Sequence, residues 1–170
     1  MNDVLITWAG FARASEQLEH LKTVGRREGA ERIRNALLTE TNAGESADYL
    51  GAREEQARLE RKIAELERRL AQSTIVEPDG GNGILDVGER ARLQDLETQE
   101  TVEYELVGSL EADPAAGRIS AASPVGRALL GRRKGEVAVV DVPKGRLTFE
   151  ILSIETPHES HAAAAAAAAG

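Results

Sequence analysis

The chain has 170 residues, a formal net charge of −8 and no cysteine. The absence of thiols excludes a disulfide framework and a thiolate metal site, and the acidic balance argues against a free nucleic-acid-binding protein, because such domains carry a basic field. With one Trp, two Tyr and two Phe, the chain also has too few aromatic residues for an aromatic-lined pocket or a base-stacking surface.

No apolar run reaches the roughly 18 residues that a membrane-spanning helix needs. The first residues also lack the basic and apolar regions of a secretory signal. We therefore expect a cytoplasmic protein with no membrane partner. The three histidines, His20, His158 and His161, have no metal or catalytic spacing, so we expect no free-standing enzyme and no cofactor of its own.

The first half of the chain, residues 1–76, predicts two long helices. Thr7 is suited to cap the first helix. Apolar residues then recur with helical spacing, and the stripe resumes after a phase change near Gly25 and Gly29. Its predicted members are Phe11, Ala14, Leu18, Leu21, Ala30, Ile33 and Leu37.

The second helix carries a heptad seam with spacings that alternate between three and four residues. The seam consists of Tyr49, Ala52, Gln56, Leu59, Ile63, Leu66 and Leu70. The turn formers of residues 41–46 separate the two helices, and so short a connection makes them antiparallel neighbours. The pattern predicts a coiled-coil hairpin with its tip at 41–46. A structural coiled coil that mediates dimerisation is the simplest alternative.

A turn-rich linker at 77–83 leads to a second domain at 84–156, with strands expected near 89–96, 100–107, 135–142 and 146–154. One short helix lies among them: Ser123 is its N-cap, Pro124 suits its first position and Gly131 ends it. We therefore predict an α+β protein whose second domain is antiparallel. The low-complexity tail, 157–170, is expected to be disordered or artificially appended and is set aside.

Several ordered blocks of the chain resemble the Gre family of bacterial transcription elongation and transcript-cleavage factors. They are residues 21–36, 47–56, 107–120 and above all 119–135. The resemblance implies a coiled-coil hairpin and an FKBP-like C-terminal domain. It also implies a monomer that binds RNA polymerase at the rim of the secondary channel, inserts its tip toward the active site, and meets the RNA 3′ end only within that complex.

The tip departs from the family pattern. Cleavage-competent members carry an Asp and, three residues later, a Glu, which help to hold a second Mg²⁺ in the polymerase active site. Here the corresponding residues are Asn42 and Glu45. Mg²⁺ is bound through carboxylates in such sites, and Asn lacks the charge. We therefore expect a factor that inhibits transcription without stimulating cleavage. The alternative is a cleavage factor acting through Glu45, while Glu40 and Asp48 are interpreted as solvated charges.

The resemblance assigns further residues to contacts. Arg53 matches a basic position near the tip and is a candidate for contact with RNA or the channel. Ser123, Pro124, Gly126 and Arg127 match the polymerase-docking signature, although a purely local role in shaping the helix is equally plausible.

Residues 77–170 hold 9 basic and 16 acidic residues, a net charge of −7. This charge predicts a basic or mixed patch on the polymerase rim. A prolyl isomerase is disfavoured, because this half offers only Tyr104 and Phe149 as pocket walls. A scaffold without affinity for polymerase is disfavoured by the signature.

Overall fold

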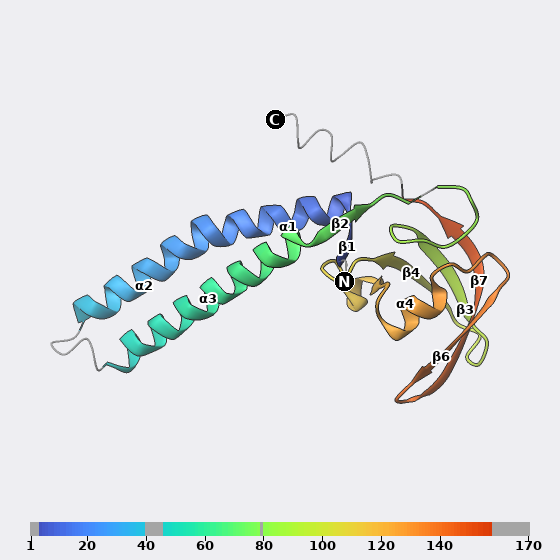
Figure 1. Ribbon diagram of the computed structural model, residues 1–170. Coiled ribbons are helices and arrows are strands. Elements are labelled where there is room, and N and C mark those ends of the chain that lie inside the picture. Colours follow the sequence, from blue (N-terminus) through green and yellow to red (C-terminus); the bar gives the residue numbers. More distant parts are fainter. Residues whose placement is uncertain (1–3, 40–45, 79, 158–170) are drawn as a thin grey trace. The chain divides into compact units, whose positions relative to one another are not determined.

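Two helical arms form the antiparallel hairpin that the sequence predicted (Figure 1). The computed structural model describes residues 4–39, 46–78 and 80–157. The first arm runs through α1 (Trp8–His20), a π-helical turn η1 (Leu21–Gly25) and α2 (Arg26–Thr39), and the second arm is α3 (Ala47–Ala71). The π-helical turn lies where the apolar stripe changes phase, because one wider turn rotates the following helix relative to the preceding one.

The seam of the second arm is confirmed, since Ile63 is buried and the six other predicted positions are all partly buried. The apolar stripe predicted for the first arm is wrong at two positions after η1. Ala30 and Leu37 are exposed, whereas Gly29 and Ala36 are buried at the contact with α3. A side chain on Gly29 would place its Cβ 2.1 Å from Oε1 of Gln56. Small residues therefore permit the close approach of the two arms.

Among the described residues, three ion pairs join the arms, and in each the cation comes from the first arm and the carboxylate from α3. Each would be broken by a slip of one helical turn, which displaces the partners by about 5.4 Å. Such exposed pairs add little stability, so they mainly favour one register. The pairs are Lys22–Glu67 at 3.0 Å, Arg32–Glu55 at 2.7 Å, and Arg26–Glu60, which is bidentate with distances of 2.9 and 2.8 Å.

The second domain is a five-stranded sheet around the short helix α4 (Pro124–Leu129), in the strand order β5-β4-β3-β7-β6 (Figure 1). Its core contains nine buried apolar residues from the sheet, from α4 and from the segment before β3, among them Leu93, Leu129 and Ile151. The strands are β3 (Arg90–Asp95), β4 (Thr101–Val107), β5 (Arg118–Ser120), β6 (Val137–Val142) and β7 (Gly145–Glu155).

The predicted α+β class is confirmed, but the sheet is mixed rather than wholly antiparallel. β5 runs parallel to β4, with Glu105 opposite Arg118 and Val107 opposite Ser120. The chain returns through the 3₁₀ turn η3 (Pro114–Ala116) before it enters β5. The sequence did not predict β5, because a strand of three residues is too short to show a readable alternation.

The segment from Val4 to Ala12 belongs to the second domain. β1 (Val4–Thr7) pairs in parallel with β2 (Ser73–Val76), and Ile6 is completely buried. The compact units are accordingly residues 13–72 and residues 1–12 with 73–170, whereas the sequence placed the whole of 1–76 in the hairpin. The predicted cap is confirmed, since the Gly10 amide donates to the Thr7 hydroxyl at 3.0 Å.

Two glycines provide a matched test of this packing. A Cβ on Gly108 would lie 1.8 Å from the carbonyl oxygen of Leu5 in β1, whereas a Cβ on Gly51 would meet nothing within 4 Å. We expect Gly108→Ala to lower the free energy of unfolding by about 1–3 kcal/mol through overpacking. Gly51→Ala should instead raise it by about 0.5–1 kcal/mol, because alanine has the higher helix propensity.

Urea unfolding measures both effects, with far-UV circular dichroism reporting the helices and Trp8 fluorescence reporting the unit that contains β1. If the Gly108→Ala variant is as stable as the unchanged chain, β1 does not pack against Gly108.

The Arg26–Glu60 pair predicts a dependence of stability on pH. The hydrogen bond from Arg26 lowers the pKa of Glu60 below its usual value. A lowered folded-state pKa stabilises the fold above the unfolded-state pKa of glutamate, about 4.3, and this contribution disappears as the pH falls through the folded-state pKa. Glu60→Gln should therefore destabilise the hairpin at neutral pH and be equivalent to the unchanged chain in acid.

The measurement is thermal unfolding of both chains over a pH series. Glu31→Gln is the matched control, because Glu31 is exposed and forms no ion pair with any described residue. A destabilisation by Glu60→Gln that persists unchanged in acid would contradict the role given to the ion pair.

Candidate functional sites

The predicted tip residues Asn42 and Glu45 lie outside the described residues, but the start of α3 beside them is well defined. Ser46 is buried, and its hydroxyl accepts a hydrogen bond of 3.1 Å from the amide of Tyr49. This is an N-cap, with Ser46 in an extended conformation (φ −72°, ψ 140°). Glu45 thus immediately precedes a capped helix N-terminus, whose dipole favours carboxylates.

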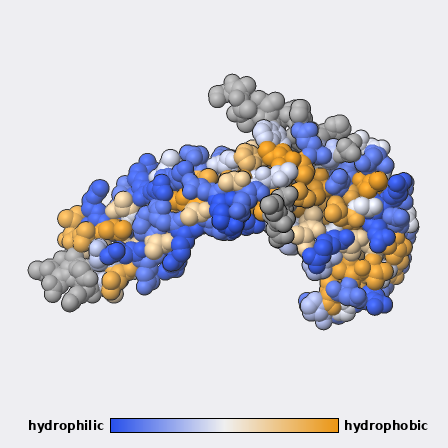
Figure 2. Space-filling model, in the orientation of Figure 1, coloured by the Kyte–Doolittle hydropathy of each residue, from blue (hydrophilic) through white to orange (hydrophobic). Residues whose placement is uncertain are grey.

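Exposed leucines flank the tip on both arms, and sequence analysis did not identify them as functional. Leu38 is 79% exposed, and Leu37 and Leu50 are each about half exposed. Orange surface lies at this end of the hairpin in Figure 2. The seam explains none of them, because Leu37 lies off the seam and the other two were not assigned to it. They give the end of the hairpin an apolar surface beside the tip.

Arg53 lies on the exposed side of α3, with its guanidinium 5.9 Å from the centre of the Tyr49 ring. This cation–π contact orients the side chain without neutralising it. By contrast, the ion pairs of Arg26 with Glu60 and of Arg58 with Glu54 offset two other charges of the rod. Arg53 forms no ion pair with any described residue.

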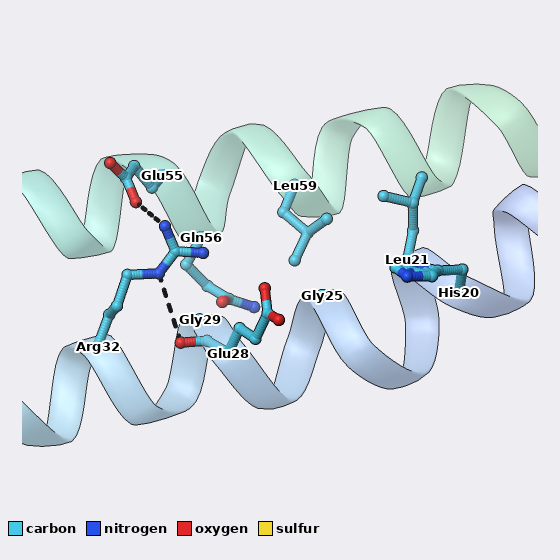
Figure 3. A pocket seen from close by; sticks show the side chains of 9 residues that line it. All are labelled: His20, Leu21, Gly25, Glu28, Gly29, Arg32, Glu55, Gln56 and Leu59. Atoms are coloured by element: carbon cyan, nitrogen blue, oxygen red, sulfur yellow. Dashed lines mark hydrogen bonds and ion pairs between the residues drawn. The ribbon is translucent and has the colours of Figure 1, made fainter.

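A shallow cavity of about 240 Å³ lies between the arms (Figure 3). It exists because Gly25 and Gly29 lack side chains opposite Leu59 and Gln56. Arg32 closes one end by pairing with Glu55. Oε1 of Gln56 is buried, accepts no hydrogen bond from any described residue and lies against Gly29. We interpret the cavity as a polar layer in the helix contact rather than as a reaction site.

The described residues contain no group of three His, Cys, Asp or Glu that could hold a metal ion. Within the same ranges, no helix is both long and apolar enough to cross a membrane. Tyr104 and Phe149 meet edge to face, with ring centres 6.3 Å apart; Phe149 is buried in the core of the second domain and Tyr104 is partly buried against it.

The predicted docking signature separates into two groups. Ser123 accepts a 3.0 Å hydrogen bond from the amide of Gly126, which confirms the predicted N-cap. Gly126 is buried, and a Cβ there would lie 2.0 Å from the carbonyl oxygen of Ser120. These two residues shape the helix, whereas Pro124 and Arg127 are exposed. Leu130, which the signature did not assign to contact, is also exposed.

The comparison with known proteins covers both domains. A family model described as the N-terminal domain of transcription elongation factors matches residues 4–75. A second, described as the C-terminal domain of the elongation factors GreA/GreB, matches residues 81–156. The chain belongs to the GreA/GreB family. The resemblance seen in the sequence is therefore confirmed, and this Gre-family chain is a transcription elongation factor.

The relatives of this Gre-family chain include proteins named transcription elongation factor GreA. Those of Acetivibrio thermocellus and Clostridioides difficile are 41% and 43% identical to it over 153 residues, which cover 89% of this chain and 96% of each relative. Among solved structures, the GreA factor homolog 1 (Gfh1) of Thermus thermophilus is 30% identical, with a TM-score of 0.40 over 91% of this chain and 99% of that one.

The structural half of the signature can be tested at Ser123. We expect Ser123→Ala to lower the free energy of unfolding of the second domain by about 1 kcal/mol, because the Gly126 amide loses its acceptor. Ser123→Asp restores an acceptor and should recover most of the loss. Urea unfolding followed by Trp8 fluorescence measures both variants. An alanine variant of unchanged stability would show that Ser123 is not needed as a cap.

Proposed function

We propose that this elongation factor binds RNA polymerase through its second domain, at the rim of the secondary channel. The end of the hairpin then enters the channel. The factor acts as a monomer and as an accessory to the polymerase active site rather than as an enzyme. The dimensions of α3 support this proposal, since 25 residues span about 37 Å at 1.5 Å per residue. The cross-arm ion pairs favour one register along that length.

The hairpin is proposed to lower transcription by occupying the channel without stimulating cleavage of the transcript. The observation that carries this proposal is Asn42, at the position where cleavage-competent family members carry Asp. When bound in the polymerase active site, a second Mg²⁺ would activate water for hydrolysis of the RNA. The neutral amide of Asn42 offers that ion one oxygen and no charge, which leaves Glu45 as the only matching carboxylate.

Arg53 is proposed to contact the phosphate backbone of the RNA 3′ segment within the complex. Its charge is not offset by an ion pair with any described residue, and its ring contact with Tyr49 holds the guanidinium near the tip. Phosphate contacts of this kind position a nucleic acid without reading its sequence. The exposed leucines on both arms support a fit against protein walls around the same end.

The second candidate function is stimulation of cleavage through Glu45. It is favoured by the 41–43% identity to relatives named GreA. In the sequence Glu45 also immediately precedes the capped start of α3, and a helix N-terminus favours carboxylates.

Transcript cleavage in a stalled, backtracked elongation complex distinguishes the two candidates. We expect the unchanged chain to slow nucleotide addition without shortening the RNA. Asn42→Asp should raise the cleavage rate by at least about tenfold, the lower end of the effect of groups that support a bound metal. Asn42→Asp combined with Glu45→Gln should lose that gain.

Asn35→Asp is the matched control, because it makes the same chemical change on α2, away from the tip, and should gain no cleavage. Cleavage by the unchanged chain would refute the inhibitory proposal and favour the second candidate. No effect on nucleotide addition and no binding to polymerase would refute both.

A further inference from the structure

Charge is segregated within the second half of this chain. From residue 114 to residue 135 there are five basic residues and no acidic one, a local charge of +5. The rest of 77–170 holds four basic and all sixteen acidic residues, a charge of −12. The average of −7 thus describes neither part. The positive segment includes α4 and the loop that joins it to β6 (Figure 1).

Four of these cations form no ion pair with any described residue. Three other arginines of the domain are paired, namely Arg90 with Glu105, Arg118 with Asp113 and Arg146 with Asp141, at 3.0–3.2 Å, whereas Arg92 forms no ion pair with a described residue. No described carboxylate forms an ion pair with the four exposed cations of α4 and the following loop. We call them the basic arc; they are Arg127, Arg132, Arg133 and Lys134.

Hydrogen bonds to the backbone orient two side chains of the basic arc without cancelling their charge. Nη1 of Arg127 donates to the carbonyl of Ala122 at 2.6 Å, and Nε of Arg132 donates to that of Ala128 at 3.2 Å. The carboxylate of Glu136 accepts a hydrogen bond of 2.8 Å from the backbone amide of Arg133 and forms no ion pair with a described residue.

The loop that carries the basic arc is attached to the core at both of its ends. The amide of Gly131 donates to the carbonyl of Leu85, and the amide of Leu85 donates to the carbonyl of Arg132. At the other end, the Gly135 amide donates to the carbonyl of Ile151. Gly131 and Gly135 both have positive φ, 79° and 84°, which lets the chain turn twice within five residues. The cations therefore project from a fixed backbone, which lowers the entropy lost on binding.

Apolar side chains accompany the basic arc. Leu130 is 40% exposed and Val137 is 41% exposed, and they lie immediately before and after the loop in the chain. Pro124 is also exposed at the start of α4. A surface with apolar residues among charged ones is typical of a protein-binding site, in which apolar contact gives affinity and charge gives orientation.

We propose that the basic arc, with Leu130 and Val137, is the surface by which this domain docks on RNA polymerase, and that it recognises an acidic, partly apolar protein surface. This inference rests on the proposed function. It reverses the expectation, drawn from the net charge of the domain, that the partner surface is basic or mixed. The cations that face the partner decide that the partner's surface must be acidic. Carboxylates elsewhere in the domain matter less, because salt at 0.1 M screens their charge over about 10 Å.

A nucleic acid fits this surface less well. The remaining charge of −12 repels a phosphate backbone that extends beyond the arc. Within residues 77–170, Phe149 is buried in the core and Tyr104 is partly buried against it, which leaves little aromatic surface there on which a base could stack. An acidic patch on a protein can contact the basic arc alone and so avoids the acidic remainder of the domain.

The test is binding of the full chain to core RNA polymerase at low and at high salt, measured by surface-immobilised kinetics. Arg132→Glu combined with Arg133→Glu should weaken binding at low salt by about tenfold or more, chiefly through slower association. Its affinity should also depend less on salt than that of the unchanged chain. Arg132→Ala with Arg133→Ala should show a smaller loss in the same direction.

Arg92→Glu combined with Lys144→Glu is the matched control. Both residues are exposed and lie outside the arc, neither forms an ion pair with a described residue, and the change in net charge is the same. We expect binding within about twofold of the unchanged chain, since distant exposed charges are largely screened. Trp8 fluorescence in urea verifies that each variant is folded. If the double glutamate variant of Arg132 and Arg133 is unfolded, the binding of the double alanine variant tests the proposal instead.

The outcomes separate the inference from the function on which it rests. If the unchanged chain does not bind polymerase, the proposed function fails. If the unchanged chain binds and the folded arc variants bind equally well, the docking proposal alone is refuted. An equal loss in the control variant would also refute it. Binding of duplex DNA or RNA without polymerase, abolished by the arc substitutions, would overturn the assignment to a protein partner.

Discussion

The buried carboxylate of Glu111 is the contact on which the arrangement of the second domain depends. Its oxygens accept hydrogen bonds from the amide and the hydroxyl of Thr7, and a third of 3.2 Å from the amide of Gly108. A buried carboxylate is tolerated when hydrogen bonds satisfy its oxygens. The same contact explains Gly10, because a Cβ there would lie 2.0 Å from the Glu111 carboxyl group. Residues that are 104 positions apart are thereby joined, so β1 and the capped start of α1 become part of the sheet domain.

The hairpin is organised on a different principle from the domain. Few of its residues are buried, and its described contacts combine a narrow apolar seam, small residues such as Gly29, and exposed ion pairs between the arms. Exposed pairs contribute little free energy, and two helices bury too little apolar surface for a large stability. The result is a slender element with a favoured register and solvated sides, consistent with the entry into the polymerase channel that we propose for it.

The sequence predicted the features that depend on local spacing and missed those that depend on distant contacts. The seam of α3, the caps at Thr7 and Ser123 and the four longer strands follow from periodicity and capping preferences, and all are present. The pairing of β1 with β2 and the buried position of Glu111 depend on residues far apart in the chain, for which no local pattern exists. The position of Gly29 at the helix contact was missed because glycine carries no hydropathy signal.

At the candidate docking site, too, residue types could be identified from the sequence, but which of those residues are exposed could not. The motif of α4 was identified from residue types, but only the structure separates Ser123 and Gly126, which shape the helix, from Arg127, which is exposed. Likewise, a net charge averages over the whole domain, whereas a partner meets one surface. Because electrostatic attraction at physiological salt decays within about 8–10 Å, unpaired cations held on a rigid loop determine what that loop attracts, whatever the sum of the charges elsewhere.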